Sequence, residues 1–279
     1  MNATESGGQE ITWDWISKDE RIKKKILVKG WWNGARPFDG TSCALKIDVD
    51  DFGDFDVAKE IRMPSINHFF YTVGEGETIF ERMLDRLLLT MNVHEECLVE
   101  YLVDDLVYSA KIKLLQFECS VANYALDAEK KFEKAKNIKE RGVELFKEGR
   151  VLDAYYRFKK AAQLLIFLDR NQEQYLPTYL IVCNNLAQCH LQLGNYEHVL
   201  TLCSKVLEKE PLNVKCLLRR AAALENLKDF EKALDEYKKI LQIESNNQRA
   251  LERYQIVKKE VDSMNERYNQ AVKRMFNFT

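Results

Sequence analysis

The chain has 279 residues, 46% of them hydrophobic, which is enough for one large domain or two ordinary ones with well-formed cores. Its 42 Lys and Arg residues nearly balance its 44 Asp and Glu residues, and the net charge of −2 excludes a global field that would attract nucleic acid or an anionic membrane. The sequence shows neither a run of about 18 apolar residues nor a signal-peptide pattern at its start. We therefore expect a cytoplasmic protein, with the nucleus left open as a second compartment.

Between residues 22 and 118 the chain is rich in Val, Ile, Phe, Tyr and Trp, in short runs separated by Gly, Asp and Pro. Such runs are typical of strands in an antiparallel sheet, and they read CALKIDV, HFFYTV, CLVEYLV and AKIKLLQFE. The stretch TIFERMLDRLLLTM differs, because its apolar residues have the spacing of one amphipathic helix packed on a sheet. We therefore predict an α+β domain over residues 21–120, after a flexible segment over residues 1–20.

The seven cysteines include no C-x-x-C pair, and several of them fall on the apolar faces of expected helices. An odd number without paired spacing indicates buried reduced thiols rather than disulfides or a metal site. The sequence therefore gives no reason to expect a metal or any other cofactor.

After residue 121 the composition changes to Ala, Leu, Glu and Lys at helical period, and three stretches of this half repeat one pattern. Each stretch has a small residue in a first helix, a turn, and a second helix with a short and a bulkier side chain four residues apart. The small residues are Gly142, Ala187 and Ala221, the turns fall at Gly149, Gly194 and Lys228, and the second-helix pairs are Ala154/Phe158, Val199/Cys203 and Ala233/Tyr237. Small residues let two helices approach closely, and this pattern is typical of tetratricopeptide (TPR) repeats.

The spacing of the small residues supports this assignment. It is 34 residues between the second and third units (221 − 187), the length of a TPR repeat, and 45 between the first and second (187 − 142), which implies longer helices around that connection. Three units are about the minimum that can bury the faces of such an array. We therefore predict an all-α TPR domain over residues 122–279, with repeats at about 135–168, 180–213 and 214–247 and a C-terminal capping helix over 249–276.

Several stretches taken together resemble the large FK506-binding immunophilins (the FKBP family). In the second half, NLAQCHLQLG, NVKCLLRRAAALENLKDFEKAL and a last helix ending AVKRMF are similar to the repeat module of that family. In the first half, HFFYTVGEGETIFERMLDRLLLTM, EECLVEYLV and AKIKLLQFE follow the order of the family's prolyl isomerase domain. The combination is most similar to divergent members, in which a degenerate isomerase domain precedes three repeats.

The resemblance implies a pocket in the N-terminal domain. In active members this pocket is a dry cup of aromatic side chains with a Trp floor and a long Tyr-bearing flap. The pocket positions are occupied here by Phe55, Asp56, Phe69, Tyr71, Glu77 and Ile79. Arg82 stands in place of the Trp floor, where a charged guanidinium without a buried partner is unsuitable. In addition, the strands that should flank the flap are joined by almost nothing, so we expect no catalytic residue and no isomerase activity.

The resemblance also implies a groove that binds chaperone tails ending in Glu-Glu-Val-Asp. At the family's carboxylate-binding positions this chain has Lys139, Asn185, Lys215 and Arg219. A terminal carboxylate and an Asp side chain present two close negative charges, which cations and an amide bind through charge-assisted hydrogen bonds. Lys215 and Arg219 repel each other across one helical turn in the empty site, and the ligand relieves this repulsion. Val143 departs from the family pattern, where many members have Asn, and we expect it to weaken binding.

These features predict a non-catalytic TPR co-chaperone, in which the repeats bind the C-terminal tail of an Hsp90-class chaperone and the N-terminal domain contacts an unknown client or regulatory protein. The tail of an Hsp70-class chaperone stays open as a second partner. Two alternatives also stay open: a weakly active peptidyl-prolyl cis-trans isomerase targeted to chaperone complexes, and a TPR scaffold for an unrelated acidic C-terminal tail. We expect a monomer without nucleic-acid or membrane partners.

Overall fold

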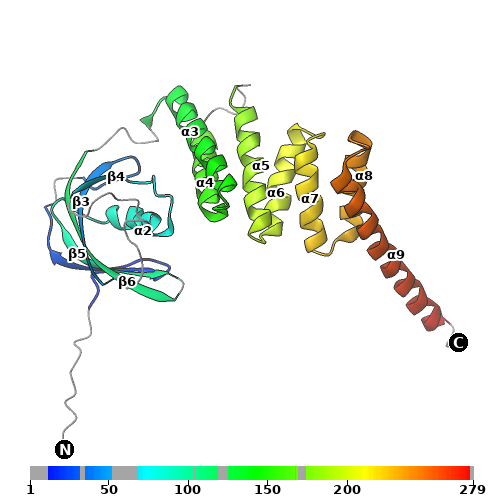
Figure 1. The fold of residues 1–279 in the computed structure, drawn as a ribbon, viewed down its shortest axis with the longest axis horizontal. Helices are drawn as coiled ribbons and strands as arrows, with labels where there is room; N and C mark the ends of the chain where they lie inside the picture. The colour runs from blue at the N-terminus through cyan, green and yellow to red at the C-terminus, as the bar shows by residue number, and fades with distance from the viewer. Residues whose placement is uncertain are drawn as a thin grey trace, which may run out of the picture. The chain divides into compact units, whose positions relative to one another are not determined.

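The computed structural model of the chain describes residues 12–31, 35–51, 68–103, 105–118, 125–166, 168 and 174–276. The chain divides into two compact units, Met1–Leu126 and Asp127–Thr279 (Figure 1). Of the expected pocket residues, Phe55 and Asp56 lie outside the described residues, and Phe69 is described only as part of a strand. None of the helices within the described residues is long and apolar enough to cross a lipid bilayer.

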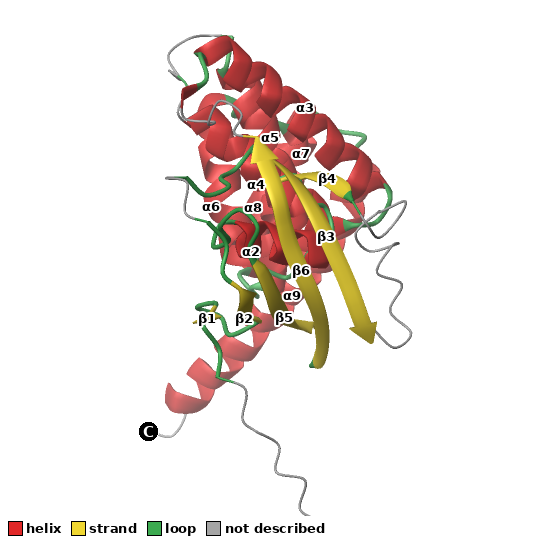
Figure 2. Cartoon of the chain, turned by 90° about the vertical axis from the view of Figure 1, so that its left-hand side faces the viewer, coloured by secondary structure: helices red, strands yellow, loops and turns green. Residues whose placement is uncertain are grey.

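The first unit contains a six-stranded antiparallel sheet with the strand order β1-β2-β5-β6-β3-β4 (Figure 2). The strands are β1 (Trp15–Ile16), β2 (Ile22–Val28), β3 (Ser42–Asp51), β4 (Phe69–Thr72), β5 (Glu96–Val103) and β6 (Leu106–Glu118). The predicted α+β class and its strands are thus confirmed. One expectation is wrong in part, because β1 lies inside the segment expected to be flexible and is held there by backbone pairing with β2.

Helix α2 (Ile79–Leu88) lies on the concave side of this sheet (Figure 1). A capping box starts the helix, in which the Thr78 hydroxyl accepts from the Glu81 N–H and the Glu81 carboxylate accepts from the Thr78 N–H. The apolar side of the helix is buried against the sheet, as the sequence pattern predicted. The core contains Phe80, Met83, Leu84, Leu87 and Leu88 of α2 together with Ile22, Leu45, Ile47, Val99 and Ile112 of the strands.

The second unit is helical and consists of three antiparallel helix pairs followed by one long helix (Figure 1). The pairs are α3 (Ala128–Lys147) with α4 (Val151–Ile166), α5 (Leu176–Gln192) with α6 (Tyr196–Lys209), and α7 (Val214–Asn226) with α8 (Phe230–Ile243), and the last helix is α9 (Gln248–Phe276). This order confirms three TPR repeats and a capping helix. The first helix begins before residue 135, because the Asp127 side chain accepts the Lys130 N–H at 2.8 Å and caps it there.

The three hairpin turns share one backbone geometry at the predicted positions. Gly149, Gly194 and Lys228 all have positive φ, at 81°, 76° and 65°. In each turn, the residue after the positive-φ position donates its backbone N–H to the carbonyl of the residue five positions before it. The donor and acceptor pairs are Arg150 to Leu145, Asn195 to His190 and Asp229 to Leu224. This is a Schellman-type helix end, which glycine adopts without strain and which lysine adopts at a cost in free energy.

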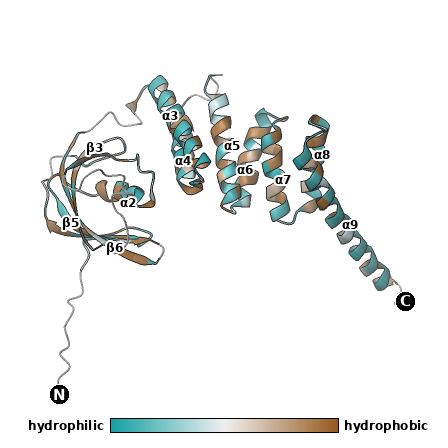
Figure 3. Cartoon of the chain, viewed as in Figure 1, coloured by the Kyte–Doolittle hydropathy of each residue, from teal (hydrophilic) through white to brown (hydrophobic). Residues whose placement is uncertain are grey.

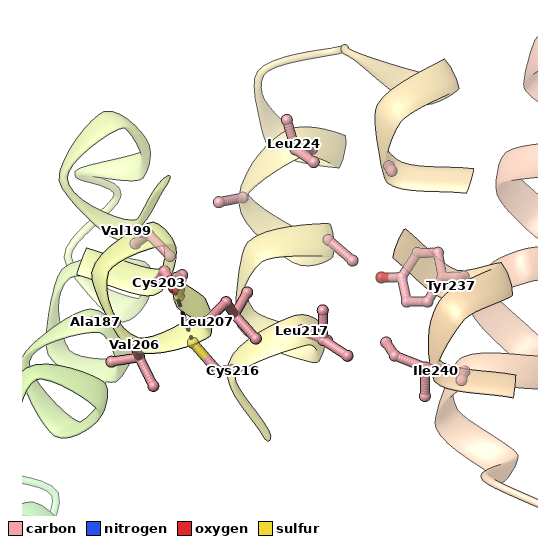
Figure 4. Packing of buried hydrophobic residues seen from close by; sticks show 14 of the residues in the cluster. Ala187, Val199, Cys203, Val206, Leu207, Cys216, Leu217, Leu224, Tyr237 and Ile240 are labelled. Atoms are coloured by element: carbon pink, nitrogen blue, oxygen red, sulfur yellow. Dashed lines mark hydrogen bonds between the residues drawn. The ribbon is translucent and has the colours of Figure 1, made fainter. Parts of the chain in front are cut away.

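Small and medium side chains pack the helices of the second unit together. Both hydrophilic and hydrophobic residues occur along its helices (Figure 3). The buried hydrophobic residues form two clusters, and Tyr179 and Leu202 pack against both of them. Figure 4 shows Cys203 of α6 against Cys216 of α7, where the Cys216 thiol donates to the Cys203 carbonyl at 3.5 Å. On the other side of α7, Leu217 faces Tyr237 and Ile240 of α8. Helix α7 therefore packs against helices on both of its sides.

Candidate functional site

The four residues predicted to bind a peptide carboxylate come from the first helices of the three repeats. Lys139 lies in α3 and Asn185 lies in α5, whereas Lys215 and Arg219 lie one turn apart in α7. The antiparallel pairing of the helices sets this placement. Each hairpin turn sends the second helix back along the first, so the next first helix runs in the same direction as the one before it, and α7 packs against α5 as well as against α6. The site is therefore an arrangement of first-helix side chains.

Arg219 extends from α7 to α5 and makes the best-defined contacts of the site. Its Nε donates to the side-chain oxygen of Gln188 at 2.8 Å, and its Nη1 donates to the side-chain oxygen of Asn184. Asn184 and Gln188 are one helical turn apart in α5, so they present both oxygens on one face. Within the described residues, Arg219 hydrogen-bonds only to these uncharged groups and has no carboxylate partner.

The surroundings make the positive charge of Arg219 costly to bury. Burial lowers the pKa of Arg219 below its usual value, because desolvation disfavours the charged guanidinium. The charge of Arg249, in the first turn of α9, lowers this pKa further. An arginine nevertheless stays protonated in proteins. The site therefore holds a permanent, partly desolvated positive charge that only neutral groups contact.

Two nearby arginines, Arg220 and Arg253, differ from Arg219 because each of them has a carboxylate partner. Arg220 donates to the Glu236 carboxylate in α8 at 2.8 and 3.1 Å, and Arg253 in α9 donates to the buried carboxylate of Glu225. Both contacts are charge-assisted and neutralise the guanidinium inside the fold. Arg219 alone of these three arginines remains without a negative partner in the described part of the chain.

The other three predicted residues have fewer contacts than Arg219 within the described residues. Lys215 is exposed and Asn185 is partly buried, and neither forms a hydrogen bond or ion pair within the described residues. The Lys139 ammonium lies 3.5 Å from the carboxylate of the adjacent Glu140. No hydrogen bond or ion pair joins Lys139 to α5 or α7 among the residues that the structure describes. The joint action of Lys139 with the other three residues therefore stays a prediction.

Asn184 and Gln188 are absent from the predicted set, which contains the adjacent Asn185 instead. Their spacing of four residues puts them on one helix face, and this much is visible in the sequence once α5 is placed. Which face of α5 turns toward Arg219 depends on how α5 and α7 pack. The two amides could therefore be found only from the structure.

In the first unit, Tyr71 of β4 is tied to α2. Its hydroxyl lies 2.8 Å from the Asp85 carboxylate and 3.0 Å from the Glu81 carbonyl oxygen. The same Asp85 oxygen accepts the Gly74 N–H at 2.6 Å. The Glu77 N–H donates to the Glu81 carboxylate at 2.7 Å, so this expected pocket residue belongs to the start of α2. Tyr71 and Gly74 therefore tie the β4 region to α2, whereas Glu77 takes part in the start of the helix.

Two further features bear on the predicted isomerase pocket. Arg82, at the predicted floor position, donates from Nη1 to the Glu77 carbonyl at 2.7 Å, and Ile79 is 37% exposed. β5 ends at Val103 and β6 begins at Leu106, so only two residues join the strands. The predicted lack of a long connection here is confirmed, whereas the assignment of Arg82 to the pocket floor stays a prediction.

The residues that the structure describes contain no candidate metal site. Among them, no group of three or more His, Cys, Asp or Glu side chains could hold a metal ion. The six cysteines of the described ranges are all buried: Cys43, Cys97, Cys183, Cys189, Cys203 and Cys216.

Comparison with known proteins gives relatives over most of the chain, although no family model matches it. The chain is 30% identical over 242 residues to "FK506-binding protein-like" of Mus musculus, covering 85% of this chain and 66% of that protein. It is 27% identical over 264 residues to "Peptidyl-prolyl cis-trans isomerase FKBP4" of Rattus norvegicus, covering 87% of this chain and 55% of that protein. The matched region thus spans less than two thirds of the length of these relatives.

Among solved structures, residues 1–211 of CG17282 superpose on 66% of this chain and on 96% of their own length, with a TM-score of 0.55 and 21% identity. At that identity the likeness shows the fold alone. The two sequence matches cover 85% and 87% of this chain, so each extends over parts of both units. The chain belongs to the FK506-binding-protein-like, TPR-containing immunophilins.

Proposed function

We propose that this protein is a non-catalytic co-chaperone, whose helical unit binds the C-terminal tail of an Hsp90-class chaperone and whose first unit contacts a client or regulatory protein. The observation that carries the proposal is the partly buried guanidinium of Arg219, which contacts only the neutral oxygens of Asn184 and Gln188. A partly desolvated cation without a counter-charge favours an anionic ligand. The terminal carboxylates of a Glu-Glu-Val-Asp tail supply that charge.

Lys215 adds a second cation one turn before Arg219, and its exposed ammonium is free to reach a ligand. A hydrogen bond to a charged group contributes about 1.5 to 3 kcal/mol. Loss of both cations should therefore weaken peptide binding roughly 100-fold or more. Val143 lies in α3 one turn after Lys139, and its aliphatic side chain offers no donor, so we expect a dissociation constant in the micromolar range or above.

Isothermal titration with a peptide ending in Glu-Glu-Val-Asp tests the proposal. The Lys215→Ala/Arg219→Ala double variant should lose binding, whereas a Lys205→Ala/Lys209→Ala variant should keep it. This control also removes two cations spaced four residues apart, but from α6. Equal binding by wild type and the α7 double variant would rule out the proposed site.

The identity of the tail needs its own comparison. A peptide with an amidated C-terminus keeps the acidic side chains but lacks the terminal carboxylate, so it should bind much more weakly than the free acid. Tails from Hsp90-class and Hsp70-class chaperones, and an unrelated acidic C-terminal peptide, can be compared in the same titration. Tighter binding of the unrelated peptide would favour the scaffold alternative.

For the first unit we infer that prolyl isomerase activity is lost. Two observations support this: the charged Arg82 at the predicted floor position, and the two-residue connection between β5 and β6. Prolyl isomerisation in an apolar cup depends on a dry cavity that favours the twisted amide, and a guanidinium works against dryness. A protease-coupled assay on a proline peptide should show no rate above the uncatalysed reaction. Clear catalysis would instead support the weakly active isomerase alternative.

A further inference from the structure

We infer that Asn184 and Gln188 act as a neutral cradle for Arg219: their amide oxygens hold the guanidinium in place without neutralising it, so that it stays available to a carboxylate ligand. This inference rests on the carboxylate-binding site proposed above and assigns a positioning role to both residues. Its basis is geometric, because two successive turns of α5 supply acceptors to one guanidinium of α7.

The chemistry of arginine fixes how the amides are used. A guanidinium only donates hydrogen bonds, so the amide oxygens of Asn184 and Gln188 must face it, and the amide NH2 groups are left to donate elsewhere. Neither NH2 group has an acceptor within the described residues. Arg219 uses two of its five N–H groups in these contacts, which leaves three (five minus two). A carboxylate at this point would therefore meet several donors.

The neighbouring ion pairs show what a charged partner does instead. Arg220 and Arg253 are paired with carboxylates from within the fold, those of Glu236 and Glu225. A carboxylate at position 184 or 188 would bind Arg219 in the same charge-assisted way. A ligand carboxylate would then have to displace a tethered one of the same charge. Neutral amides avoid this competition and still fix the rotamer of the long side chain.

A purely structural role of these amides predicts a different outcome from a cradle. If Asn184 and Gln188 only pack Arg219 against α5, a carboxylate in their place should strengthen the contact and leave ligand binding unchanged. If they form a cradle, the same change should keep or raise thermal stability while it weakens ligand binding. The two readouts therefore move in opposite directions only for the cradle.

The test uses the full chain with two near-isosteric variants, Gln188→Glu and Asn184→Asp. Gln192→Glu is the matched control, because it adds the same charge one turn further along α5 at an exposed position. Titration with a peptide ending in Glu-Glu-Val-Asp should show at least tenfold weaker binding for both cradle variants, and binding within threefold of wild type for the control. The melting temperatures of the cradle variants should not fall. Binding by both variants within threefold of wild type would overturn the inference.

A second measurement separates this inference from the proposed function. The 15Nε–1H signal of Arg219, assigned by its loss in Arg219→Lys, can be followed while succinate is added to wild type and to Gln188→Glu. We expect the signal to shift in wild type and not in the variant. A shift with succinate but no peptide binding would contradict the chaperone-tail proposal and support the cradle. An Arg219 signal that responds to neither ligand in wild type would refute both.

Discussion

Gly142 of α3 lies directly against the ring of Phe158 in α4, and a Cβ added to Gly142 would meet Cε1 of that ring at 2.8 Å and Cδ1 at 2.9 Å. Phe158 is 1% exposed, so its ring has no solvent to move into. The absence of a side chain at Gly142 therefore sets how closely the two helices of the first repeat approach.

Gly142→Ala should for this reason destabilise the helical unit, although alanine is the better helix former. Overpacking of a core costs about 1 to 3 kcal/mol, and the gain in helix propensity offsets up to about 1 kcal/mol of it. Urea denaturation followed by circular dichroism should show a lower free energy of unfolding. Adding Phe158→Leu should recover part of the loss by making room. An increase in stability for Gly142→Ala alone would contradict this account of the packing.

Lys228→Gly should stabilise the third repeat. Lys228 has a φ of 65°, where a side chain costs roughly 1 to 2 kcal/mol, whereas glycine loses about 0.5 to 1 kcal/mol in chain entropy. We therefore expect a net gain of about 0.5 kcal/mol and a small rise in melting temperature. Lys238→Gly in α8 is the control, since the same change inside a helix should lower stability. A loss of stability in Lys228→Gly would show that other contacts of this lysine outweigh the backbone strain.

Breaking the ion pair between Lys24 and Glu95 should strongly destabilise the first unit. Its atoms are 2.8 Å apart, the side chains are 4% and 1% exposed, and Lys24 also donates to the Thr90 carbonyl at 3.0 Å. Glu95→Ala should destabilise the unit by about 3 to 5 kcal/mol, because it leaves a buried charge unpaired. The double variant Lys24→Met/Glu95→Met should recover most of that loss.

Tryptophan fluorescence measures this effect separately from the helical unit. All four tryptophans of the chain lie in the first unit, so their signal during urea titration reports on its unfolding alone. A Glu95→Ala variant with an unchanged fluorescence midpoint would contradict the expected cost of leaving Lys24 unpaired.

Acidic pH should weaken the junction between the first and second repeats. His190 of α5 packs on Tyr155 of α4 and on His198 of α6, with ring centroids 5.1 and 4.9 Å apart. Burial, followed by the charges of His198 and Lys159, lowers the pKa of His190 below its usual 6.5. Below pH 6.5 the unfolded chain therefore binds a proton that the folded chain resists, and stability falls as pH drops through that window.

One variant can measure how much His190 contributes to the pH dependence of stability. His190→Phe keeps an aromatic ring but cannot titrate, so its stability should fall less than that of wild type between pH 7.5 and pH 5.5. His68→Gln is the control, because it removes an exposed histidine of the first unit and leaves the contacts of His190 intact. Equal pH dependence in wild type and His190→Phe would mean that other groups are responsible.

The architecture of both units was predictable from local patterns, for identifiable reasons. The spacing of apolar residues in TIFERMLDRLLLTM specifies an amphipathic helix whatever it packs on, and α2 occupies that stretch. Gly149 and Gly194 mark turns because glycine tolerates positive φ. Other features depended on pairing between distant segments. β1 is a strand only because β2 offers it an edge, and its two residues carry no strand pattern of their own.

The sequence by itself determined two units, the three repeats, and the register that puts Lys139, Asn185, Lys215 and Arg219 on first helices, because helical periodicity and turn residues are local properties. Only the tertiary structure decided which side chains meet. Arg219 and Arg220 are adjacent and chemically identical, yet the packing of α7 between its neighbours turns one toward the amides of α5 and the other toward Glu236 of α8. That difference separates a guanidinium available to a ligand from one neutralised inside the fold, and it arises from contacts between helices far apart in the chain.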